Sequence, residues 1–294
     1  MSAHPERLTL ALQKSGRLAE RSLELVREAG LSVVKSANEL FFRVENYPVD
    51  LLRVRDDDIP TLVGDNVADL GVIGLNVLAE QSHGSGQRAE IVMPLGFGRC
   101  DLKIAIPESM EYGGIAALTG RRIATSYPNL LRKFLEERDI AAEIVEMRGA
   151  VEVAPRLKLA HAICDVVSTG ATLEANGLRA VETVLKSEAV LVRSPVAPAD
   201  TVKHLLDIVV ERFRGVTASR GAKYVMMNAP KAMLGRISEI LPGADAPTVV
   251  PLVGHDEMVA VHAVCQESVF WETLEQLKAV GASAILVLPI EKML

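Results

Sequence analysis

The chain has 294 residues, of which 49% are hydrophobic and 24% charged, a composition that allows a large buried core and excludes wholesale disorder. Its 32 basic and 38 acidic side chains give a net charge of −6, which argues against a general nucleic-acid binder, since such proteins contact many phosphates with Lys and Arg. At roughly 150 residues per domain, the length predicts about two domains, or three small ones.

The first hundred residues alternate short apolar strands with amphipathic helices. Strands are predicted at residues 8–12, 40–44, 49–54 and 70–73, and helices at residues 18–29 and from residue 56 onward. The first helix ends at Gly30. The second begins with three aspartates, which suit the positive end of the helix dipole.

A second alternation of strands and helices begins after the glycines at 96 and 98. Strands are predicted at residues 102–106, 122–125, 144–147 and 162–167, and helices at residues 129–137 and 153–160. Two α/β units in tandem predict a two-lobed body. Residues 181–192 are strand-rich and could return the chain to the first lobe, as in cleft proteins of the periplasmic-binding-protein type, although periodicity alone does not establish that crossover.

A linker is predicted at residues 195–198 and a helix at residues 199–214, and the pattern after them predicts a complete small module. Its elements are strand 224–227, helix 231–241, strands 248–252 and 258–264, helix 268–280 and strand 284–289. This βαββαβ order is the ferredoxin-like split motif. Such modules often bind small effectors, although fold alone does not prove it.

The sharpest chemical signal is the segment CDVVSTGAT, residues 164–172, which runs from an apolar strand through a loop into a helix that starts near Thr172. Ser, Thr and Gly ahead of a helix direct several N–H groups and hydroxyls at one point, which suits a phosphate. Asp165 at the strand end is placed to accept hydrogen bonds from sugar hydroxyls. An ordinary helix N-cap is the alternative, and the residues alone leave both open.

Two further segments are candidates for lining a ligand cleft. The turn QKSGR follows the first strand, where ligands sit in open α/β sheets, and Lys14 and Arg17 could meet negative charge there. A solvated turn is the alternative. In DLGVIG, residues 69–74, glycines around a buried strand permit either the close approach of a flat ligand or close packing of strand and helix.

Several kinds of site are not supported by the sequence. The six histidines lack H-E-x-x-H spacing and an evident Ser or Cys partner, which leaves metal hydrolysis and triad catalysis without support. Cys100, Cys164 and Cys265 are odd in number and lack C-x-x-C spacing, which favours a reducing compartment. With no signal peptide and no run of about 18 apolar residues, we expect a cytoplasmic protein without membrane contact.

Seven segments together resemble one enzyme family. They are LQKSGRL, DLLRVRDDDIP, DLGVIG, RRIATSYPNLLRKFL, VEVAPRL, AICDVVSTGATLEANGL and FWETLEQLKAVGASAILVLPIEKM. In this order, from about residue 8 to the C-terminus, they closely resemble the long form of ATP phosphoribosyltransferase, the first enzyme of histidine biosynthesis. The resemblance implies an α/β fold with a two-lobed, periplasmic-binding-protein-like catalytic body and a C-terminal ferredoxin-like regulatory domain. Residues 1–98 with 181–217 would form one lobe, residues 99–180 the other, and residues 218–294 the regulatory domain.

The resemblance also implies a reaction and the residues that serve it. The family joins N1 of the adenine of ATP to C1 of the ribose of phosphoribosyl pyrophosphate, releases pyrophosphate and requires Mg²⁺. Phosphoribosyl pyrophosphate would contact Asp165, Ser168, Thr169, Gly170, Ala171 and Thr172. ATP would contact Lys14, Gly16, Arg17, Arg53, Asp69, Gly71 and Tyr127. No catalytic base is assigned, because adenine N1 already offers a lone pair, and no ligand of the metal is assigned.

For the last domain, the resemblance implies histidine as a feedback inhibitor. Its site would comprise Asn228, Ala244, Ala246, Thr248, Val264 and Ala284. Relatives can carry an acid where this chain has Asn228, and an amide brings no charge to the ammonium group of the ligand. Histidine is expected to shift a homo-oligomer between a hexamer and an active dimer.

Two alternatives remain at this stage. A phosphoribosyltransferase of the other fold type has two adjacent acids before a T-G-x-T loop, but Cys164 occupies the position of the first acid here. A cytoplasmic ligand sensor could be built on the same two-lobed architecture. Such a sensor should bind one ligand without releasing pyrophosphate.

Overall fold

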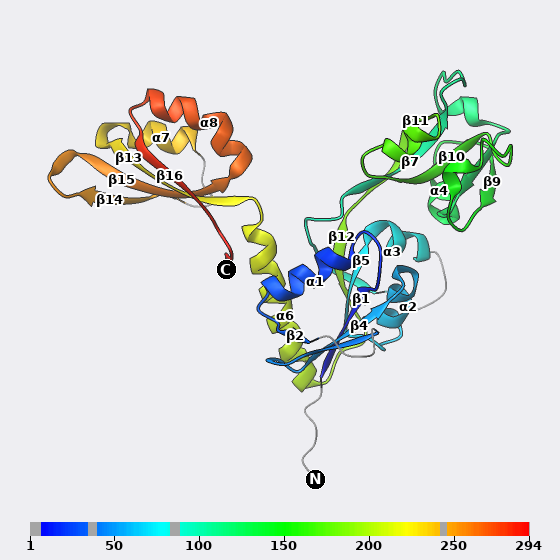
Figure 1. Cartoon of the computed structure of the whole chain (residues 1–294), viewed down its shortest axis with the longest axis horizontal. Coiled ribbons are helices and arrows are strands. Elements are labelled where there is room, and N and C mark those ends of the chain that lie inside the picture. Colours follow the sequence, from blue (N-terminus) through cyan, green and yellow to red (C-terminus); the bar gives the residue numbers. More distant parts are fainter. Residues whose placement is uncertain (1–6, 35–39, 83–88, 242–245, 294) are drawn as a thin grey trace, which may run out of the picture. The chain divides into compact units, whose positions relative to one another are not determined.

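The computed structural model describes residues 7–34, 40–82, 89–241 and 246–293 (Figure 1). The chain divides into two compact units, residues 1–209 and 210–294, and each is described by itself below. Among the described residues, no helix is both long enough and apolar enough to span a membrane.

A seven-stranded sheet forms the first lobe of the first unit. Across the sheet the strands are β2 (Val33–Val34), β3 (Phe41–Val44), β4 (Val49–Val54), β1 (Leu8–Gln13), β5 (Leu70–Gly74), β12 (Ala189–Arg193) and β6 (Glu90–Pro94). Strand β1 pairs in parallel with β4 and β5, while β12 pairs antiparallel with β5 and β6. The central strands are continuous apolar runs because both faces of the sheet are covered there.

Three helices follow the parallel strands of this sheet. They are α1 (Ala19–Glu28) after β1, α2 (Ile59–Gly64) after β4 and α3 (Leu75–Gln81) after β5. The helix predicted from residue 56 begins later than expected, because residues 56–58 form a 3-10 turn and the α-helix starts at Ile59. Pro60 in its first turn suits a helix start, where the missing N–H group is not needed.

A five-stranded sheet forms the second lobe. Across the sheet the strands are β11 (Leu178–Ser187), β7 (Cys100–Pro107), β10 (Ala162–Val167), β8 (Arg122–Thr125) and β9 (Glu143–Glu146). Strand β8 is parallel to β9 and β10, whereas β7 is antiparallel to β10 and β11. Helix α4 (Pro128–Glu136) follows β8 and α5 (Ala171–Ala175) follows β10, so the two strand-to-helix turns lie at the same edge of the sheet.

The chain crosses between the two sheets twice, and the crossings run side by side. The N–H group of Leu95 donates to the carbonyl of Ala189, and the N–H group of Ala189 donates to the carbonyl of Phe97. The sequence assigned residues 181–217 to the first lobe, but residues 181–187 belong to β11 in the second sheet. Antiparallel pairing of β11 with β7 continues to Ser187, opposite Cys100, and the return crossing therefore lies near residue 188.

The helix predicted at residues 153–160 is absent. A 3-10 turn at Val151–Val153 is followed by further turns, and Lys158 has a φ of 57°. A non-glycine residue with left-handed backbone geometry interrupts a right-handed helix. The apolar spacing of this segment instead serves packing, since Val151 and Ala154 are buried beneath the second sheet's strands.

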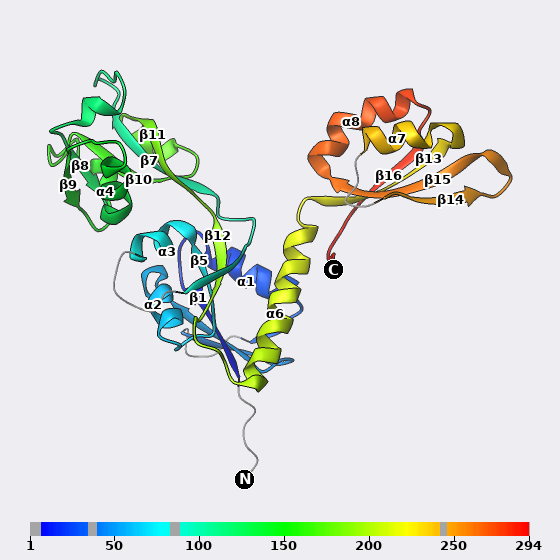
Figure 2. The same cartoon turned by 180° about the vertical axis from the view of Figure 1, so that it is seen from behind.

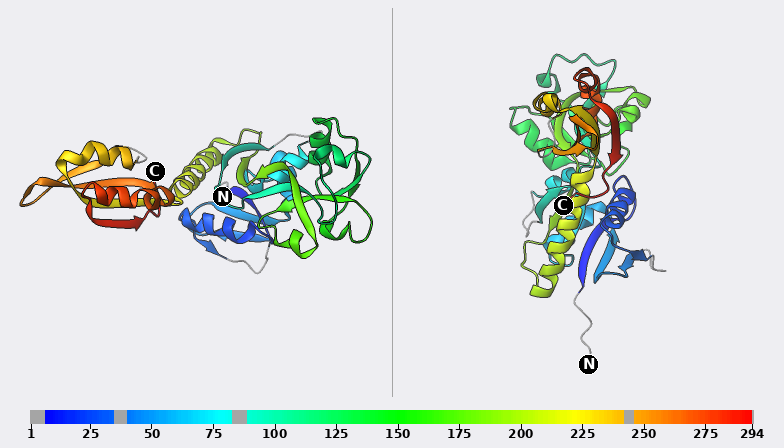
Figure 3. Two further views of the ribbon diagram at one scale, coloured as in Figure 1. Left: turned by 90° about the horizontal axis from the view of Figure 1, so that it is seen from above. Right: turned by 90° about the vertical axis from the view of Figure 1, so that its left-hand side faces the viewer.

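The second unit is a four-stranded antiparallel sheet with two helices, entered from the long helix α6 (Asp200–Ser219). Its elements in chain order are β13 (Ala222–Pro230), α7 (Leu234–Ile240), β14 (Thr248–Leu252), β15 (His255–Gln266), α8 (Glu267–Ala279) and β16 (Ser283–Pro289). The strand order is β14-β15-β13-β16, which confirms the predicted ferredoxin-like module. Both helices cover the same face of the sheet (Figure 2), and β16 lies at its edge (Figure 3).

Candidate functional site

The turn between β10 and α5, residues 168–170, leaves a set of backbone donors open. Gly170 caps α5 with a φ of 85°, a conformation that favours glycine. Within the described part of the chain, the N–H groups of residues 169–172 donate to no protein acceptor. A Cβ added to Gly170 would meet no atom within 4 Å, so the space above the turn is free. These donors can therefore hold an anion from outside the chain.

Asp165 lies on β10, three residues before this turn, and is half-buried. Its Oδ1 accepts a hydrogen bond from the N–H group of Val166 at 2.8 Å. Burial raises the pKa of Asp165, and the nearby carboxylate of Glu152 raises it further, while Arg17 opposes the shift. A desolvated carboxylate of this kind gains when hydroxyl groups of a ligand donate to it.

The turn after β1, residues 14–17, approaches the β10–α5 turn from the first lobe. Arg17 donates from Nη1 to Oγ of Ser168 at 3.1 Å. Gly16 has a φ of 103°, and a Cβ there would meet the side chain of Gln13 at 2.7 Å. Glycine at this position therefore lets the turn place Arg17 opposite Ser168.

Arg53, at the end of β4, is joined to the same turn. Its Nη2 donates to the carbonyl of Lys14 at 2.6 Å, and its guanidinium lies 4.6 Å from the centre of the Phe42 ring. The N–H group of Lys14 in turn donates to the carbonyl of Val54 at 2.7 Å. Three predicted cations, those of Lys14, Arg17 and Arg53, are thus brought to the carboxyl ends of β1 and β4, where a polyanionic ligand can be held.

Tyr127 lies in the β8–α4 turn and faces the same group of residues. Its hydroxyl accepts a hydrogen bond from Nδ2 of Asn76 at 2.8 Å. Burial raises the pKa of the Tyr127 phenol, and Asp165 and Arg17 both interact with it electrostatically. The phenol therefore remains protonated near neutral pH.

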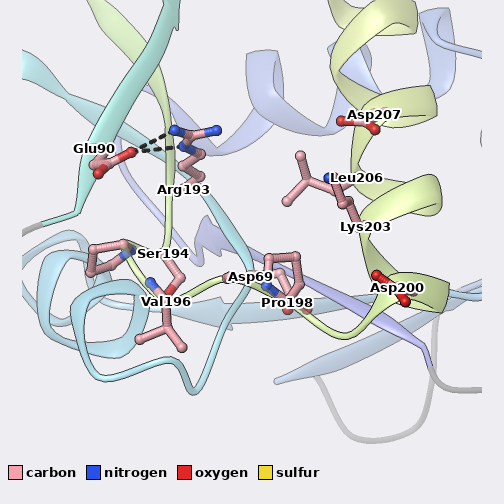
Figure 4. A pocket seen from close by; sticks show the side chains of 12 residues that line it. Asp69, Glu90, Arg193, Ser194, Val196, Pro198, Asp200, Lys203, Leu206 and Asp207 are labelled. Carbon is pink, nitrogen blue, oxygen red and sulfur yellow. Dashed lines mark hydrogen bonds and ion pairs between the residues drawn. The ribbon is translucent and has the colours of Figure 1, made fainter.

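Asp69 and Gly71 are not brought to this group. Asp69 precedes β5, and its Oδ2 accepts from the N–H group of Thr9 at 2.7 Å, near the start of β1 and away from the turn at its end. It lines a separate cavity of about 360 Å³ with Arg193, Ser194 and Lys203 (Figure 4). Most of the charged groups in that cavity are exposed, and Arg193 pairs with Glu90.

Gly71 serves close packing, the alternative that the sequence left open. A Cβ at this position would meet side-chain carbons of Ile59 at 2.8 Å and Val63 at 2.9 Å. The absence of a side chain therefore lets α2 lie close against β5. The prediction that Asp69 and Gly71 contact ATP is not supported by these positions.

A cavity of about 390 Å³ adjoins the β10–α5 turn and contains charged residues that the sequence analysis missed. Besides Ser168, Thr169 and Gly170, it is lined by Asp101, Lys103, Glu108, Glu174 and Arg179. Lys103 pairs with Asp101 at 3.2 Å, and Arg179 donates to the carbonyl of Met110. Asp101 and Lys103 lie on β7, far from residue 168 in sequence, and no local motif marks them as part of this cavity.

Cys164 is a core residue. Its side chain is 0% exposed, and burial raises the pKa of its thiol far above the usual range. The carbonyl of Cys164 accepts from Oγ1 of Thr125 at 2.7 Å, which joins β10 to β8. In this apolar environment an unpaired carboxylate at position 164 would be strongly destabilising.

In the second unit, three predicted effector residues lie on the sheet face that the helices leave uncovered. Val225, Met227 and Ala229 of β13 are buried against the helices, so the alternating position Asn228 points to the opposite face. By the same register, Val264 and Thr248 lie on that face too, through β15 and β14.

The other predicted effector residues flank this face or lie outside the described residues. Ala246 precedes β14, and Ala284 at the start of β16 has a φ of 48°. Ala244 lies outside the described residues. Tyr224 and His262, which the sequence analysis did not assign, join across the uncovered face through the Tyr224 hydroxyl and Nδ1 of His262 at 2.8 Å.

Comparisons with known proteins cover nearly the whole chain. The family described as ATP phosphoribosyltransferase matches residues 55–215, and the family described as HisG, C-terminal domain, matches residues 219–292. An ATP phosphoribosyltransferase from Maricaulis maris (strain MCS10) is 53% identical over 290 residues, which are 98% of this chain and 99% of that protein.

Two solved structures of lower identity are also similar to the two-lobed body, and the first of them shares its fold. A chain of the ATP phosphoribosyl transferase (HisG:HisZ) complex from Thermotoga maritima is 24% identical, with a TM-score of 0.59, and the match covers 70% of this chain and 98% of that chain. The periplasmic aliphatic sulphonate binding protein SsuA from Escherichia coli is 16% identical, with a TM-score of 0.46, over 74% of this chain and 71% of that chain. The body is of the two-lobed, periplasmic-binding-protein-like type, as predicted.

Proposed function

The chain belongs to the ATP phosphoribosyltransferase family, and from this premise we propose how its residues bind the substrates and how it is regulated. The protein is a pentosyltransferase that transfers the 5-phosphoribosyl group of phosphoribosyl pyrophosphate to N1 of ATP and releases pyrophosphate, the first step of histidine biosynthesis. Membership of this family sets aside the two alternatives, a phosphoribosyltransferase of the other fold type and a ligand sensor.

The 5-phosphate of phosphoribosyl pyrophosphate binds in the β10–α5 turn. The unused N–H groups of residues 169–172 and the hydroxyls of Ser168, Thr169 and Thr172 supply its hydrogen bonds. Arg17, already at 3.1 Å from Ser168, adds a positive charge. Asp165, half-buried before the turn, accepts hydrogen bonds from the ribose hydroxyls.

ATP binds along the cations at the ends of β1 and β4. Lys14, Arg17 and Arg53 lie close together there, which supports their contact with the triphosphate. Gly16 gives the turn beside them a φ of 103°, a backbone conformation that favours glycine. Asp69 and Gly71 are left out of this proposal, since their own contacts lie at the other end of β1 and against α2.

The reaction needs alignment more than acid–base groups. A lone pair on adenine N1 forms the bond to ribose C1 while the bond from C1 to the pyrophosphate oxygen breaks, so no side chain has to activate the nucleophile. The two turns hold the sugar and the nucleotide on opposite sides of one point, and such positioning contributes roughly 7–11 kcal/mol in oriented reactions. Charge on the departing pyrophosphate is neutralised by nearby cations.

Mg²⁺ is the proposed metal, and the oxygen donors of the site are consistent with an ion that binds together with the substrate. Mg²⁺ ordinarily keeps several waters and binds through substrate phosphates and one or two carboxylates. In the described residues, no group of three or more His, Cys, Asp or Glu side chains forms a ready metal site. Asp165, the carboxylate nearest in sequence to the β10–α5 turn, would be the protein group to share such an ion, which would supply positive charge near the departing pyrophosphate.

Histidine is the proposed feedback inhibitor, bound on the ferredoxin-like unit. Asn228, Thr248 and Val264 support this, because they share one uncovered sheet face. The same face exposes Leu286 and Leu288, each 52% exposed, which supports its burial in a homo-oligomer, a hexamer in equilibrium with a dimer. We also propose that the chain has three domains, with the return to the first lobe near residue 188, and that the enzyme works in the cytoplasm, where ATP is available.

The observation that carries the substrate proposal is the open set of donors beside Asp165. To test it, phosphoribosyl-ATP formation is followed by absorbance for Asp165→Ala and Thr169→Ala, with binding of phosphoribosyl pyrophosphate measured by calorimetry. Loss of hydrogen bonds to charged groups predicts at least a tenfold rise in Kd for both variants, on the order of 1.5–3 kcal/mol. Thr119→Ala, an exposed threonine at the other edge of the sheet, is the matched control. Unchanged binding in both variants would contradict the proposal.

Regulation is tested separately with the native chain. Turnover with saturating substrates is compared with and without millimolar histidine, together with the sedimentation of the protein under both conditions. Inhibition accompanied by a larger assembly supports the proposal. Equal turnover with and without histidine rules out feedback by this amino acid.

A further inference from the structure

Two side chains of α3 reach the start of α4 in the other lobe. Asn76 and Glu80 are one helical turn apart on α3. Oε1 and Oε2 of Glu80 accept from the N–H groups of Asn129 and Leu130 at 2.8 and 2.9 Å. Nδ2 of Asn129 donates back to the carbonyl of Glu80 at 3.1 Å. The backbone that carries Tyr127 is therefore held against the first lobe.

Asn76 forms a closed set of hydrogen bonds with the crossing strand. Its side chain and backbone are buried, with 2% of the residue exposed. The N–H group of Asn76 donates to Oγ of Ser187 at 3.0 Å, and Oγ of Ser187 lies 2.8 Å from Oδ1 of Asn76. Nδ2 of Asn76 lies 2.8 Å from the Tyr127 hydroxyl.

These contacts fix the direction of each proton. Oγ of Ser187 already accepts from a backbone N–H group, so its own proton is free to be donated to Oδ1 of Asn76. The amide nitrogen then faces Tyr127 and donates to the phenolic oxygen. Since that oxygen is an acceptor toward Asn76, the Tyr127 O–H proton must be donated in another direction.

The surroundings of Tyr127 indicate where that proton goes. Arg17 and Asp165, the residues proposed to meet the phosphate and the ribose, are close enough to act electrostatically on the phenol. We propose that Asn76 is a positioning residue that, with Ser187, makes Tyr127 a hydrogen-bond donor to an oxygen of the phosphorylated ribose of a bound substrate. This inference rests on the proposed function and adds to it a fixed, uncharged donor near Arg17 and Asp165. Both substrates contain a phosphorylated ribose, and the experiment distinguishes them.

The experiment measures kcat and the KM of each substrate in single and double variants. Tyr127→Phe keeps the ring and removes the donor, and a lost hydrogen bond to substrate predicts roughly a tenfold to hundredfold fall in kcat/KM. A rise in the KM of phosphoribosyl pyrophosphate alone assigns the acceptor to that sugar, and a rise in the KM of ATP alone assigns it to the nucleotide. Asn76→Ala is expected to cost about tenfold, because the phenol is then free to turn.

The double variant separates positioning from a merely structural role. If Asn76 acts through Tyr127, Asn76→Ala has no further effect on kcat/KM in the Tyr127→Phe background, and Ser187→Ala behaves in the same way. Should Asn76→Ala fail to fold, Ser187→Ala provides the same comparison. An equal loss in both backgrounds overturns the positioning role.

A second outcome overturns the donor itself. Tyr127→Phe with native kcat/KM for both substrates would refute the inference while leaving the proposed function intact, provided that Asp165→Ala is impaired. Native activity of Asp165→Ala would instead refute the proposed function.

Discussion

The β8–α4 and β10–α5 turns look alike in sequence and lie side by side in the second lobe, yet only one is open. Both pair a strand end with a hydroxyl-bearing loop and a helix start. In the β8–α4 turn, the Glu80 carboxylate accepts hydrogen bonds from the N–H groups of Asn129 and Leu130, and the Thr125 hydroxyl accepts one from the N–H group of Tyr127. In the second, the N–H groups of residues 169–172 have no acceptor within the described part of the chain. A helix start is thus a binding site only where the protein has not already filled it.

The largest expected effect on activity comes from changing Asp165, the carboxylate beside the β10–α5 turn. Asp165→Asn keeps an oxygen that can accept from the Val166 N–H group but removes the charge that accepts from ribose hydroxyls. We expect kcat/KM for phosphoribosyl pyrophosphate to fall at least about 100-fold, since hydrogen bonds to a buried charge contribute roughly 1.5–3 kcal/mol each. Steady-state kinetics measures this, with the exposed Asp139→Asn as the control that should keep native values.

The same variant should be more stable than the native chain. Burial raises the pKa of Asp165 in the folded protein above the ordinary aspartate pKa of about 4. Between these two pKa values the unfolded chain ionises at this position more readily than the folded protein. The free energy of unfolding therefore falls as the pH rises through this range. Asp165→Asn removes that loss. Its melting temperature should exceed the native one at about pH 7 and approach it at about pH 3, where both states are protonated. Equal melting temperatures at both pH values would contradict this reading of the site.

A smaller effect on substrate binding is expected when the backbone of the β10–α5 turn is altered at Gly170. Gly170→Ala forces a residue with a Cβ into a φ of 85°, at a cost of about 1–2 kcal/mol, and so disturbs the direction of the donors. We expect a weaker affinity for phosphoribosyl pyrophosphate, by about tenfold. Gly120→Ala imposes similar strain at a φ of 71°, also with no atom within 4 Å, at the opposite edge of the sheet. Calorimetry should find the affinity lowered in the first variant only, while both melt earlier.

Removing the Glu80 acceptor from the β8–α4 turn should lower the stability of the protein more than it weakens binding of the sugar phosphate. Glu80→Ala leaves the N–H groups of Asn129 and Leu130 without their acceptor, and lost helix caps cost about 0.5–2 kcal/mol. Urea denaturation measures the change. Glu136→Ala, an exposed glutamate in the last turn of the same helix, should change stability far less. A loss of the same size in both variants would mean that Glu80 does not cap α4.

The smallest effect is expected at Asp69, which the sequence analysis placed among the ATP contacts. Asp69→Asn keeps an acceptor for the Thr9 N–H group and lies away from both turns. We expect kcat/KM for each substrate to stay within about twofold, a change below 0.5 kcal/mol. A tenfold rise in the KM of ATP would return Asp69 to the nucleotide site.

The open turn could be predicted because its signal is local. Strand, acid, hydroxyls, glycine and helix follow one another from residue 164 to residue 172, and backbone geometry does the rest. The hydrogen bonds that satisfy the N–H groups of the β8–α4 turn could not be predicted in this way. Glu80 and Asn76 lie about 50 residues from the groups they contact, and nothing in the TSYP segment records their presence.

The errors in the fold have the same origin. Residues 181–187 and residues 189–193 both have strand-like patterns, but a strand-like pattern does not show which sheet each segment joins. Pairing with β7 or with β5 decides it. The contact of Asp69 with the Thr9 N–H group could not be predicted either, because the segment DLGVIG does not show which end of β1 lies beside its acid. The ferredoxin-like unit was predicted in full, because its six elements are contiguous and separated by clear turns.

The two adjacent crossings between the lobes have a mechanical consequence. Because Leu95, Phe97 and Ala189 join one crossing to the other by hydrogen bonds, we expect the two crossings to move as a pair, so that any separation of the lobes would turn about one line. The gap would then widen most on the side farthest from that line, where a bulky product such as phosphoribosyl-ATP would have room to leave. Insertions in one crossing alone would splay the pair and unbalance the opening.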